Sequence, residues 1–163
     1  MRLFTDHDAP ELGNYRKWQR VGLALELRGR LQPGVAYSLG DSGTFRLTSA
    51  AGLVRGELVG HRRYLPVLAC LRGHLDVEVG RTDDLVALGD YDDTTDRQYF
   101  TGSGRIVRVL AGGLLAISTD EAYRVVGPAE DDVEVMVLHV TVEGPSFPLV
   151  DPAERPEMVA RPV

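Results

Sequence analysis

The hydrophobic residues follow two different periods along this chain of 163 residues, one near its start and another after Gly34. Within residues 11–34 they recur at close to 3.6 positions, until Pro33 and Gly34 interrupt the pattern as residues that end helices do. This segment therefore predicts one amphipathic helix. The positions that follow the helical period are Leu12, Tyr15, Trp18 or Gln19, Leu23 and Leu27.

After Gly34 the apolar residues come in short runs, and turn residues such as Gly, Asp and Ser separate the runs. Short, regularly spaced runs are typical of a sandwich or barrel and not of parallel βαβ units. We therefore predict a mostly β fold, an antiparallel β-barrel or sandwich with the N-terminal helix packed outside. The predicted strands are residues 35–39, 44–50, 63–71, 75–80, 97–100, 105–110, 114–118, 123–126 and 133–142.

Two of these strands are apolar at even and odd positions alike. Residues 63–71 read RYLPVLACL, and the middle of residues 133–142, VEVMVLHVTV, is similar. Such strands are covered on both faces, which predicts an apolar interior with the helix on its outside. We expect an apolar cavity in that interior, reachable from one end and lined by Tyr123 and by the even-numbered residues of the strand that contains Leu68, namely Tyr64, Pro66, Leu68 and Cys70.

Composition and charge narrow the function classes. With 44% hydrophobic and 26% charged residues, the chain predicts one domain over residues 1–143 and a proline-rich C-terminal arm over 144–163. The formal charge of -6, without a basic stripe, excludes nucleic acid as an expected partner. One cysteine, a polar start and no apolar run near the roughly 20 residues of a membrane span predict a cytoplasmic protein.

The chain has no strong local catalytic or metal-binding motif: it lacks a phosphate loop, a nucleophile elbow, a CxxC pair and two histidines at ligand spacing. The aspartate-rich residues 90–100 lack the Glu and Gly of a calcium loop and predict a solvated loop. His139 projects from an apolar strand face with the parity of Val133, Val135 and Val137. Taken alone, such a histidine is more often a hydrogen-bonded structural residue than an acid–base group.

Four segments together resemble the YhcH/YjgK/YiaL family of cupin-like barrels, which are implicated in sugar processing. They are GELVGHRRYLPVLACLRG, YDDTTDRQYF, GGLLAISTDEAYRV and VEVMVLHVTV, and the likeness runs from about Leu31 to Val142. The resemblance implies a cupin-like antiparallel barrel. The positions that keep the family's pattern are His61, Tyr64, Tyr91 and Asp96.

At other positions of the family's pattern this chain carries different side chains. Val59 replaces an acidic residue of the family's pattern, Pro66 replaces Asp, Leu68 replaces Gln, Tyr123 replaces His and His139 replaces Lys. A divalent ion needs three or more N, O or S ligands, so we expect no metal and no other cofactor. His61 is then interpreted as what remains of a metal site in an interior that has become apolar.

The first functional hypothesis is a metal-independent isomerase or cyclase of specialised metabolism that acts on a largely apolar small molecule. Such a pocket would hold a flexible substrate in a reactive conformation and polarise a carbonyl by a hydrogen bond. The catalytic candidates are Tyr123, His139 and His61, with the smallest effect expected for His61. The substrate-binding candidates are Tyr64, Pro66, Leu68, Val59 and Val137.

Two alternatives remain open. One is a sugar or acyl-sugar isomerase or anomerase, as in the resembled family, with His61 and His139 as acid and base. It is disfavoured because sugars need many polar partners and an apolar interior offers few. The other is a noncatalytic barrel that binds a small molecule or forms a homodimer.

Overall fold

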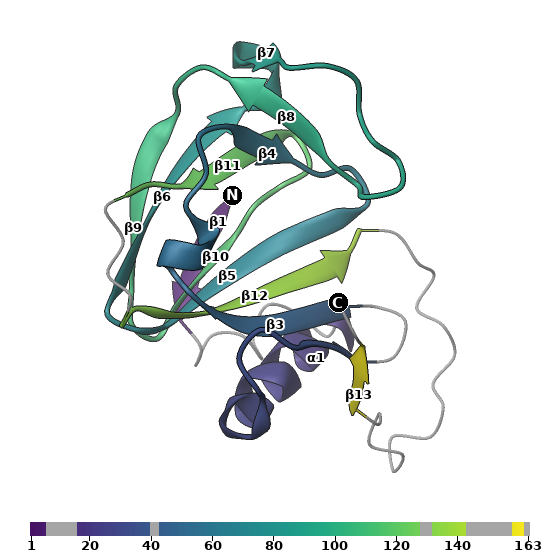
Figure 1. The fold of residues 1–163 in the computed structure, drawn as a ribbon, viewed down its shortest axis with the longest axis vertical. Coiled ribbons are helices and arrows are strands. Elements are labelled where there is room, and N and C mark those ends of the chain that lie inside the picture. Colours follow the sequence, from purple (N-terminus) through teal and green to yellow (C-terminus); the bar gives the residue numbers. More distant parts are fainter. Residues whose placement is uncertain (6–15, 40–42, 128–131, 143–157, 162–163) are drawn as a thin grey trace.

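The computed structural model describes residues 1–5, 16–39, 43–127, 132–142 and 158–161. They form two antiparallel β-sheets that face each other, with one α-helix on the outer side of the larger sheet (Figure 1). The mostly β prediction with an external helix is confirmed. The two sheets are separate, so the arrangement is a sandwich and not a closed barrel.

The larger sheet has seven strands in the order β1-β10-β5-β12-β3-β2-β13, and all neighbours are antiparallel. The long strands β5 and β12 occupy its middle. The bounds are β1 (Arg2–Thr5), β2 (Ala36–Leu39), β3 (Gly43–Ser49), β5 (Tyr64–Arg72), β10 (Gly113–Ala116), β12 (Glu134–Thr141) and β13 (Met158–Arg161).

The smaller sheet has six strands in the order β7-β8-β4-β11-β6-β9. Its bounds are β4 (Leu58–Gly60), β6 (His74–Arg81), β7 (Val86–Ala87), β8 (Gln98–Thr101), β9 (Arg105–Leu110) and β11 (Glu121–Val125). Short 3₁₀ helices span Leu27–Arg30, Ala51–Leu53 and Thr82–Asp84.

Helix α1 (Arg16–Glu26) covers the outer face of the larger sheet. Trp18, Val21 and Leu25 are buried there, and the Trp18 ring meets Phe4 of β1 edge-on at 5.9 Å between ring centroids. The predicted helix is confirmed, although the predicted stripe residue Leu23 is only half-buried because the buried stripe runs through Val21. No helix within the described ranges is long and apolar enough to cross a bilayer.

Both faces of β5 are buried, as its sequence predicts. Val67 and Ala69 pack in the cluster under the helix, whereas Leu68 and Cys70 pack in the cluster between the sheets. Strand β12 alternates in the same way, with Met136 on the helix side. The alternation of β5 and β12 therefore decides which side chains can reach the interior.

All nine predicted strands are present, and four strands were not predicted: β1, β4, β7 and β13. They have two to four residues each, too few to show a period of two. Most of the predicted arm, residues 144–163, lies outside the described residues, but β13 within it pairs with β2.

Candidate functional site

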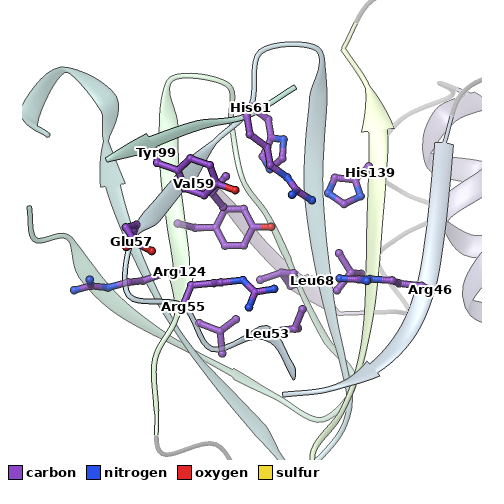
Figure 2. A pocket seen from close by; sticks show the side chains of 14 residues that line it. Arg46, Leu53, Arg55, Glu57, Val59, His61, Leu68, Tyr99, Arg124 and His139 are labelled. Atoms are coloured by element: carbon purple, nitrogen blue, oxygen red, sulfur yellow. The ribbon is translucent and has the colours of Figure 1, made fainter. Parts of the chain in front are cut away.

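A pocket of about 80 Å³ lies between the two sheets at one end of the interior (Figure 2). In each sheet, residues paired in register form one wall, because directly opposed residues point to the same face. The wall of the larger sheet contains Arg46 of β3, Val137 of β12 and Leu68 of β5. The wall of the smaller sheet contains Tyr99 of β8, Val59 of β4 and Tyr123 of β11.

The apolar part of this lining continues the core between the sheets, since Leu68 and Val137 belong to that core and are almost fully buried. Arg55, Glu57 and Arg97 line the pocket too and are exposed, so the pocket opens to solvent along this rim. A cavity reachable from one end is therefore present and Tyr123 lines it, but of the even-numbered residues of β5 only Leu68 does.

The three catalytic candidates line this one pocket. His61 directly follows β4, Tyr123 lies in the middle of β11, and His139 lies near the end of β12. The His61 ring centroid is 5.4 Å from that of His139 and 6.3 Å from that of Tyr123. Three side chains far apart in the sequence are thus close enough to act on one small molecule.

These side chains are uncharged near neutral pH. Burial lowers the pKa of His139 to about 4, helped by the neighbouring His61 and by Arg97 and Arg46. Burial also raises the pKa of Tyr123 to about 12. Each neutral imidazole carries one donor and one acceptor, and the phenol can donate a hydrogen bond.

Taken alone, the strand position of His139 favoured a hydrogen-bonded structural histidine over an acid–base group, and the structure gives a different result. Neither its imidazole nor the Tyr123 hydroxyl hydrogen-bonds to another residue in the described part of the chain. In the described residues, every fully buried side-chain nitrogen or oxygen has a hydrogen-bond partner. The polar atoms of His139 and Tyr123 have no partner there, so they are not fully buried and are accessible from the pocket. Both are therefore available to a bound molecule.

His61 is held beside a buried carboxylate. Its Nδ1 lies 3.5 Å from Oδ2 of Asp96, which is only 2% exposed. Burial lowers the pKa of His61 and outweighs the charge of Asp96, which raises it. The nearby carboxylate favours the proton on Nδ1, which leaves Nε2 as the basic nitrogen.

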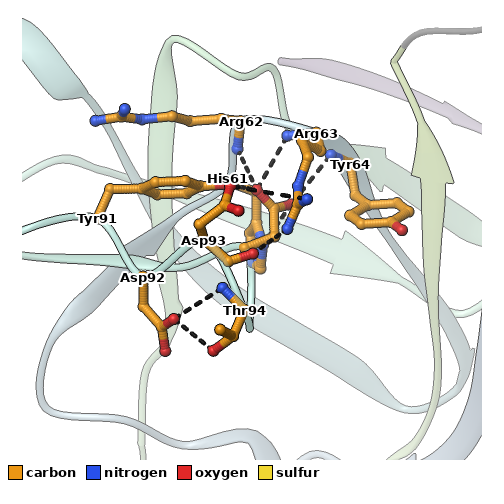
Figure 3. Close-up of polar contacts among 9 residues, drawn as sticks. His61, Arg62, Arg63, Tyr64, Tyr91, Asp92, Asp93 and Thr94 are labelled. Atoms are coloured by element: carbon orange, nitrogen blue, oxygen red, sulfur yellow. Dashed lines mark hydrogen bonds and ion pairs between the residues drawn. The ribbon is translucent and has the colours of Figure 1, made fainter.

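Asp96 is fixed by four hydrogen-bond donors. Figure 3 labels the residues that supply them, Arg62, Arg63, Tyr64 and Tyr91. Oδ1 of Asp96 accepts from the Tyr91 hydroxyl at 2.5 Å and from the Arg62 and Arg63 amides at 2.9 and 3.0 Å. Its Oδ2 accepts from the Tyr64 amide at 3.1 Å. Burial alone would raise the pKa of Asp96, but these bonds outweigh it and lower the pKa, so the carboxylate stays ionised.

The solvated-loop prediction for residues 90–100 is therefore wrong for Asp96. A tight turn brings this residue inward: Asp92 and Arg97 exchange backbone hydrogen bonds, and the Asp92 carboxylate accepts from Thr94. Asp96 itself has a φ of 53°, a left-handed conformation that Asp tolerates better than most residues. The one available signal was that Tyr91 and Asp96 keep the pattern of the resembled family.

Three arginines make the lining more polar than the sequence suggested. Arg46 and Arg55 point into the pocket from opposite sides, and Arg97 also lines it (Figure 2). Their charges lower the pKa of Tyr123, against the larger effect of burial, which raises it. The expectation of an apolar interior is thus corrected: the lining is apolar toward the core and charged toward solvent.

Of the substrate-binding candidates, Val59, Leu68 and Val137 line the pocket, whereas Tyr64 and Pro66 do not. Both have the parity of Leu68, so parity alone did not predict which residues reach the pocket. Pro66 lies opposite His139 in the sheet, and Tyr64 lies opposite Thr141 at the start of β5. The Tyr64 amide instead binds Asp96.

Within the residues that the structure describes, no three His, Cys, Asp or Glu side chains gather where they could hold a metal ion. His61 has one carboxylate beside it, and both Asp96 oxygens already accept hydrogen bonds. The structure therefore pairs His61 with Asp96, a pairing that the interpretation of His61 as a residual metal ligand did not include.

Comparisons with known proteins add little to this geometry. No protein-family model matches the chain. A cupin protein from Bacteroides fragilis is similar in structure over 74% of this chain and 91% of its own, with a TM-score of 0.40 and 14% sequence identity. A likeness this weak indicates nothing about function, and membership of the YhcH/YjgK/YiaL family stays a prediction.

Proposed function

We propose that the chain is a metal-independent enzyme of the isomerase or cyclase kind, which moves a proton on a small molecule held between the sheets. The observation that supports this most is the placement of His61, Tyr123 and His139 on one pocket as uncharged groups. The ionised Asp96 beside His61 resembles the arrangement in which a carboxylate orients a general base.

In this proposal His61 Nε2 removes a proton from a carbon next to a carbonyl. The electrons of that C–H bond form a carbon–carbon double bond, and negative charge moves to the carbonyl oxygen. The Tyr123 hydroxyl donates a hydrogen bond to that oxygen, and Asp96 stabilises the imidazolium. In an isomerisation the proton then returns to the far carbon of a double bond conjugated with the enolate. In a cyclisation the enolate carbon attacks a second carbonyl carbon of the same molecule, the π electrons of that C=O bond move to its oxygen, and His61 donates the proton to this oxygen. His139 serves as a second hydrogen-bond donor or acceptor.

The pocket sets a limit on the substrate. Ligand pockets usually measure about 300–1,000 Å³, whereas this one holds about 80 Å³. It therefore encloses the reacting part of a molecule, and the remainder extends past Arg55 and Arg97 at the rim. A charged rim disfavours the largely apolar substrate that the sequence suggested. A role in specialised metabolism is supported only by the sequence.

The sugar or acyl-sugar alternative gains support from the same lining. It was disfavoured because an apolar interior offers few polar partners, yet Arg55, Glu57, Arg97 and Tyr99 surround the opening. Aldose–ketose isomerisation and anomer interconversion both move protons, so His61 and His139 suit this substrate class as well.

A small-molecule extract of the source cells, incubated in D₂O with the protein, tests the proposal by mass spectrometry. An isomerase or cyclase should make at least one compound gain deuterium or change retention time. Tyr123→Phe, His139→Gln and His61→Gln should each slow that change about 10²- to 10⁴-fold. The effect of His61→Gln is now expected to be as large as the others because Asp96 supports it.

His74→Gln is the matched control, because His74 is an exposed histidine outside the pocket. It should leave the rate unchanged. If no compound in the extract responds to the protein, or if all three pocket variants behave like His74→Gln, the enzyme proposal is wrong and the noncatalytic alternative takes its place.

A further inference from the structure

We infer that the molecule bound in this pocket carries an acid group, a carboxylate, phosphate or sulfate, which Arg46, Arg55 and Arg97 hold. This inference rests on the proposed function for the identity of the pocket, and it names the class of substrate. A planar guanidinium fits the oxygens of such groups with paired, charge-assisted hydrogen bonds.

The pairing of arginines across the molecule supports the assignment. Some exposed arginines bind carboxylates: Arg108 lies 2.7 Å from Asp76 and Arg81 lies 3.4 Å from Asp120. Within the pocket, Arg124 lies 2.7 Å from Glu78. Arg46, Arg55 and Arg97 form no ion pair or side-chain hydrogen bond with another residue in the described ranges, and they differ from other such arginines, Arg2, Arg30 and Arg105, because all three line one pocket.

This difference is informative because carboxylates are abundant in the chain. It has 24 Asp and Glu against 18 Lys and Arg. Three positive side chains around one small pocket repel one another, and a bound anion would relieve that repulsion. In a protein of net charge -6, a positive pocket would also attract an acidic ligand against the overall field.

The other charges at the pocket do not cancel the arginines. Glu57 is the one carboxylate among the fourteen lining residues, and it is exposed at the rim. The guanidinium group of Arg124 is already bound to Glu78 and to the Gly56 carbonyl. The lining therefore keeps an excess of positive charge.

The positions of these groups divide the pocket into two regions. Arg55 and Arg97 are exposed, whereas Leu68 and Val137 close the opposite, buried end. Arg46 joins the two regions, since it is half-buried and pairs in register with Val137. The acid group would lie at the charged opening, and the carbon to be deprotonated would lie deeper, beside His61 and His139.

Isothermal titration with sodium sulfate and with sodium acetate, at an ionic strength held constant with NaCl, tests the inference on the whole chain. We expect one anion to bind per chain. Arg46→Gln, Arg55→Gln and Arg97→Gln should each weaken binding at least about tenfold, since each removes a charge-assisted hydrogen-bond donor. Tighter binding of sulfate would indicate a tetrahedral acid group, and tighter binding of acetate a carboxylate.

Arg81→Gln is the matched control, because Arg81 is an exposed arginine outside the pocket that pairs with Asp83 and Asp120. It should bind both anions as the parent does. All variants change partly exposed side chains, and thermal unfolding verifies that they are folded. The inference is overturned if neither anion binds saturably up to about 50 mM, or if Arg81→Gln weakens binding as much as the pocket variants do.

The histidine variants separate this inference from the proposed function. His61→Gln and His139→Gln should keep anion binding within about threefold of the parent, because they leave the guanidinium groups in place. Anion binding without any effect of these variants on deuterium exchange would support the inference and refute the enzyme. Deuterium exchange that depends on the histidines, without anion binding, would support the enzyme and refute the inference.

Discussion

Replacing Asp96 with Asn tests whether this carboxylate holds the pocket together. The substitution keeps the size of the side chain but removes its charge and turns one oxygen into an NH₂ group. If the amide oxygen takes the place of Oδ1, it can still accept from Tyr91, Arg62 and Arg63. The NH₂ group then faces the Tyr64 amide, which has to give up its acceptor.

The expected loss follows from these four bonds. A hydrogen bond to a charged group contributes about 1.5–3 kcal/mol and a neutral one about 1 kcal/mol. The Tyr64 bond is lost and three others weaken, while the cost of burying a charge disappears. We expect a net loss of about 3 kcal/mol, or about 6–12 °C in Tm for a chain of this length. The pKa of His61 should also fall, because the charge of Asp96 raises it.

Thermal unfolding followed by circular dichroism measures the first effect, and NMR titration of the His61 ring measures the second. Asp93→Asn is the control, since Asp93 lies in the same loop, is 81% exposed, and lies 3.7 Å from Arg63. An exposed pair of this kind contributes about 0–1 kcal/mol. If Asp96→Asn unfolds within 1 °C of Asp93→Asn, Asp96 does not organise the pocket.

Two further outcomes are expected. The pKa of His139 is about 4 when folded and 6.5 when unfolded, so the unfolded state binds more protons between these values, and the free energy of unfolding decreases as the pH is lowered from 6.5 to 4. Urea unfolding should show a loss of at most about 3 kcal/mol, since the pocket admits water, and an unchanged pH dependence in His139→Gln would contradict this. Cys70 is fully buried with a raised pKa, so a thiol reagent should label it in urea but not in the native protein, and rapid native labelling would refute its burial.

The strands and the helix could be predicted because their signals are local. The apolar runs of residues 63–71 and 133–142 became β5 and β12, buried on both faces as predicted. Strand β4, which places His61, has only three residues and showed no period. An element this short forms because its neighbours β8 and β11 supply hydrogen bonds, and a local pattern does not contain that information.

For the pocket, the sequence and the family resemblance together pointed to His61, Tyr123 and His139, and the structure places all three on one lining. Their uncharged state and the role of Asp96 were not predicted. A pKa depends on burial and on charges a few ångströms away, and Asp96 reaches His61 only through the turn after Asp92.

The orientation of the pocket arginines is the feature of the site that depends most on the tertiary structure. The sequence by itself determined the helix, nine strands and the alternation that puts Arg46 on the face opposite Phe45 and Leu47. It did not determine which face meets the other sheet. That depends on the register of β3 and β12, which pairs Arg46 with Val137 and turns a charged side chain toward the interior. Local periodicity fixes the alternation of side chains, but only contacts between segments distant in the sequence fix which charges surround a cavity.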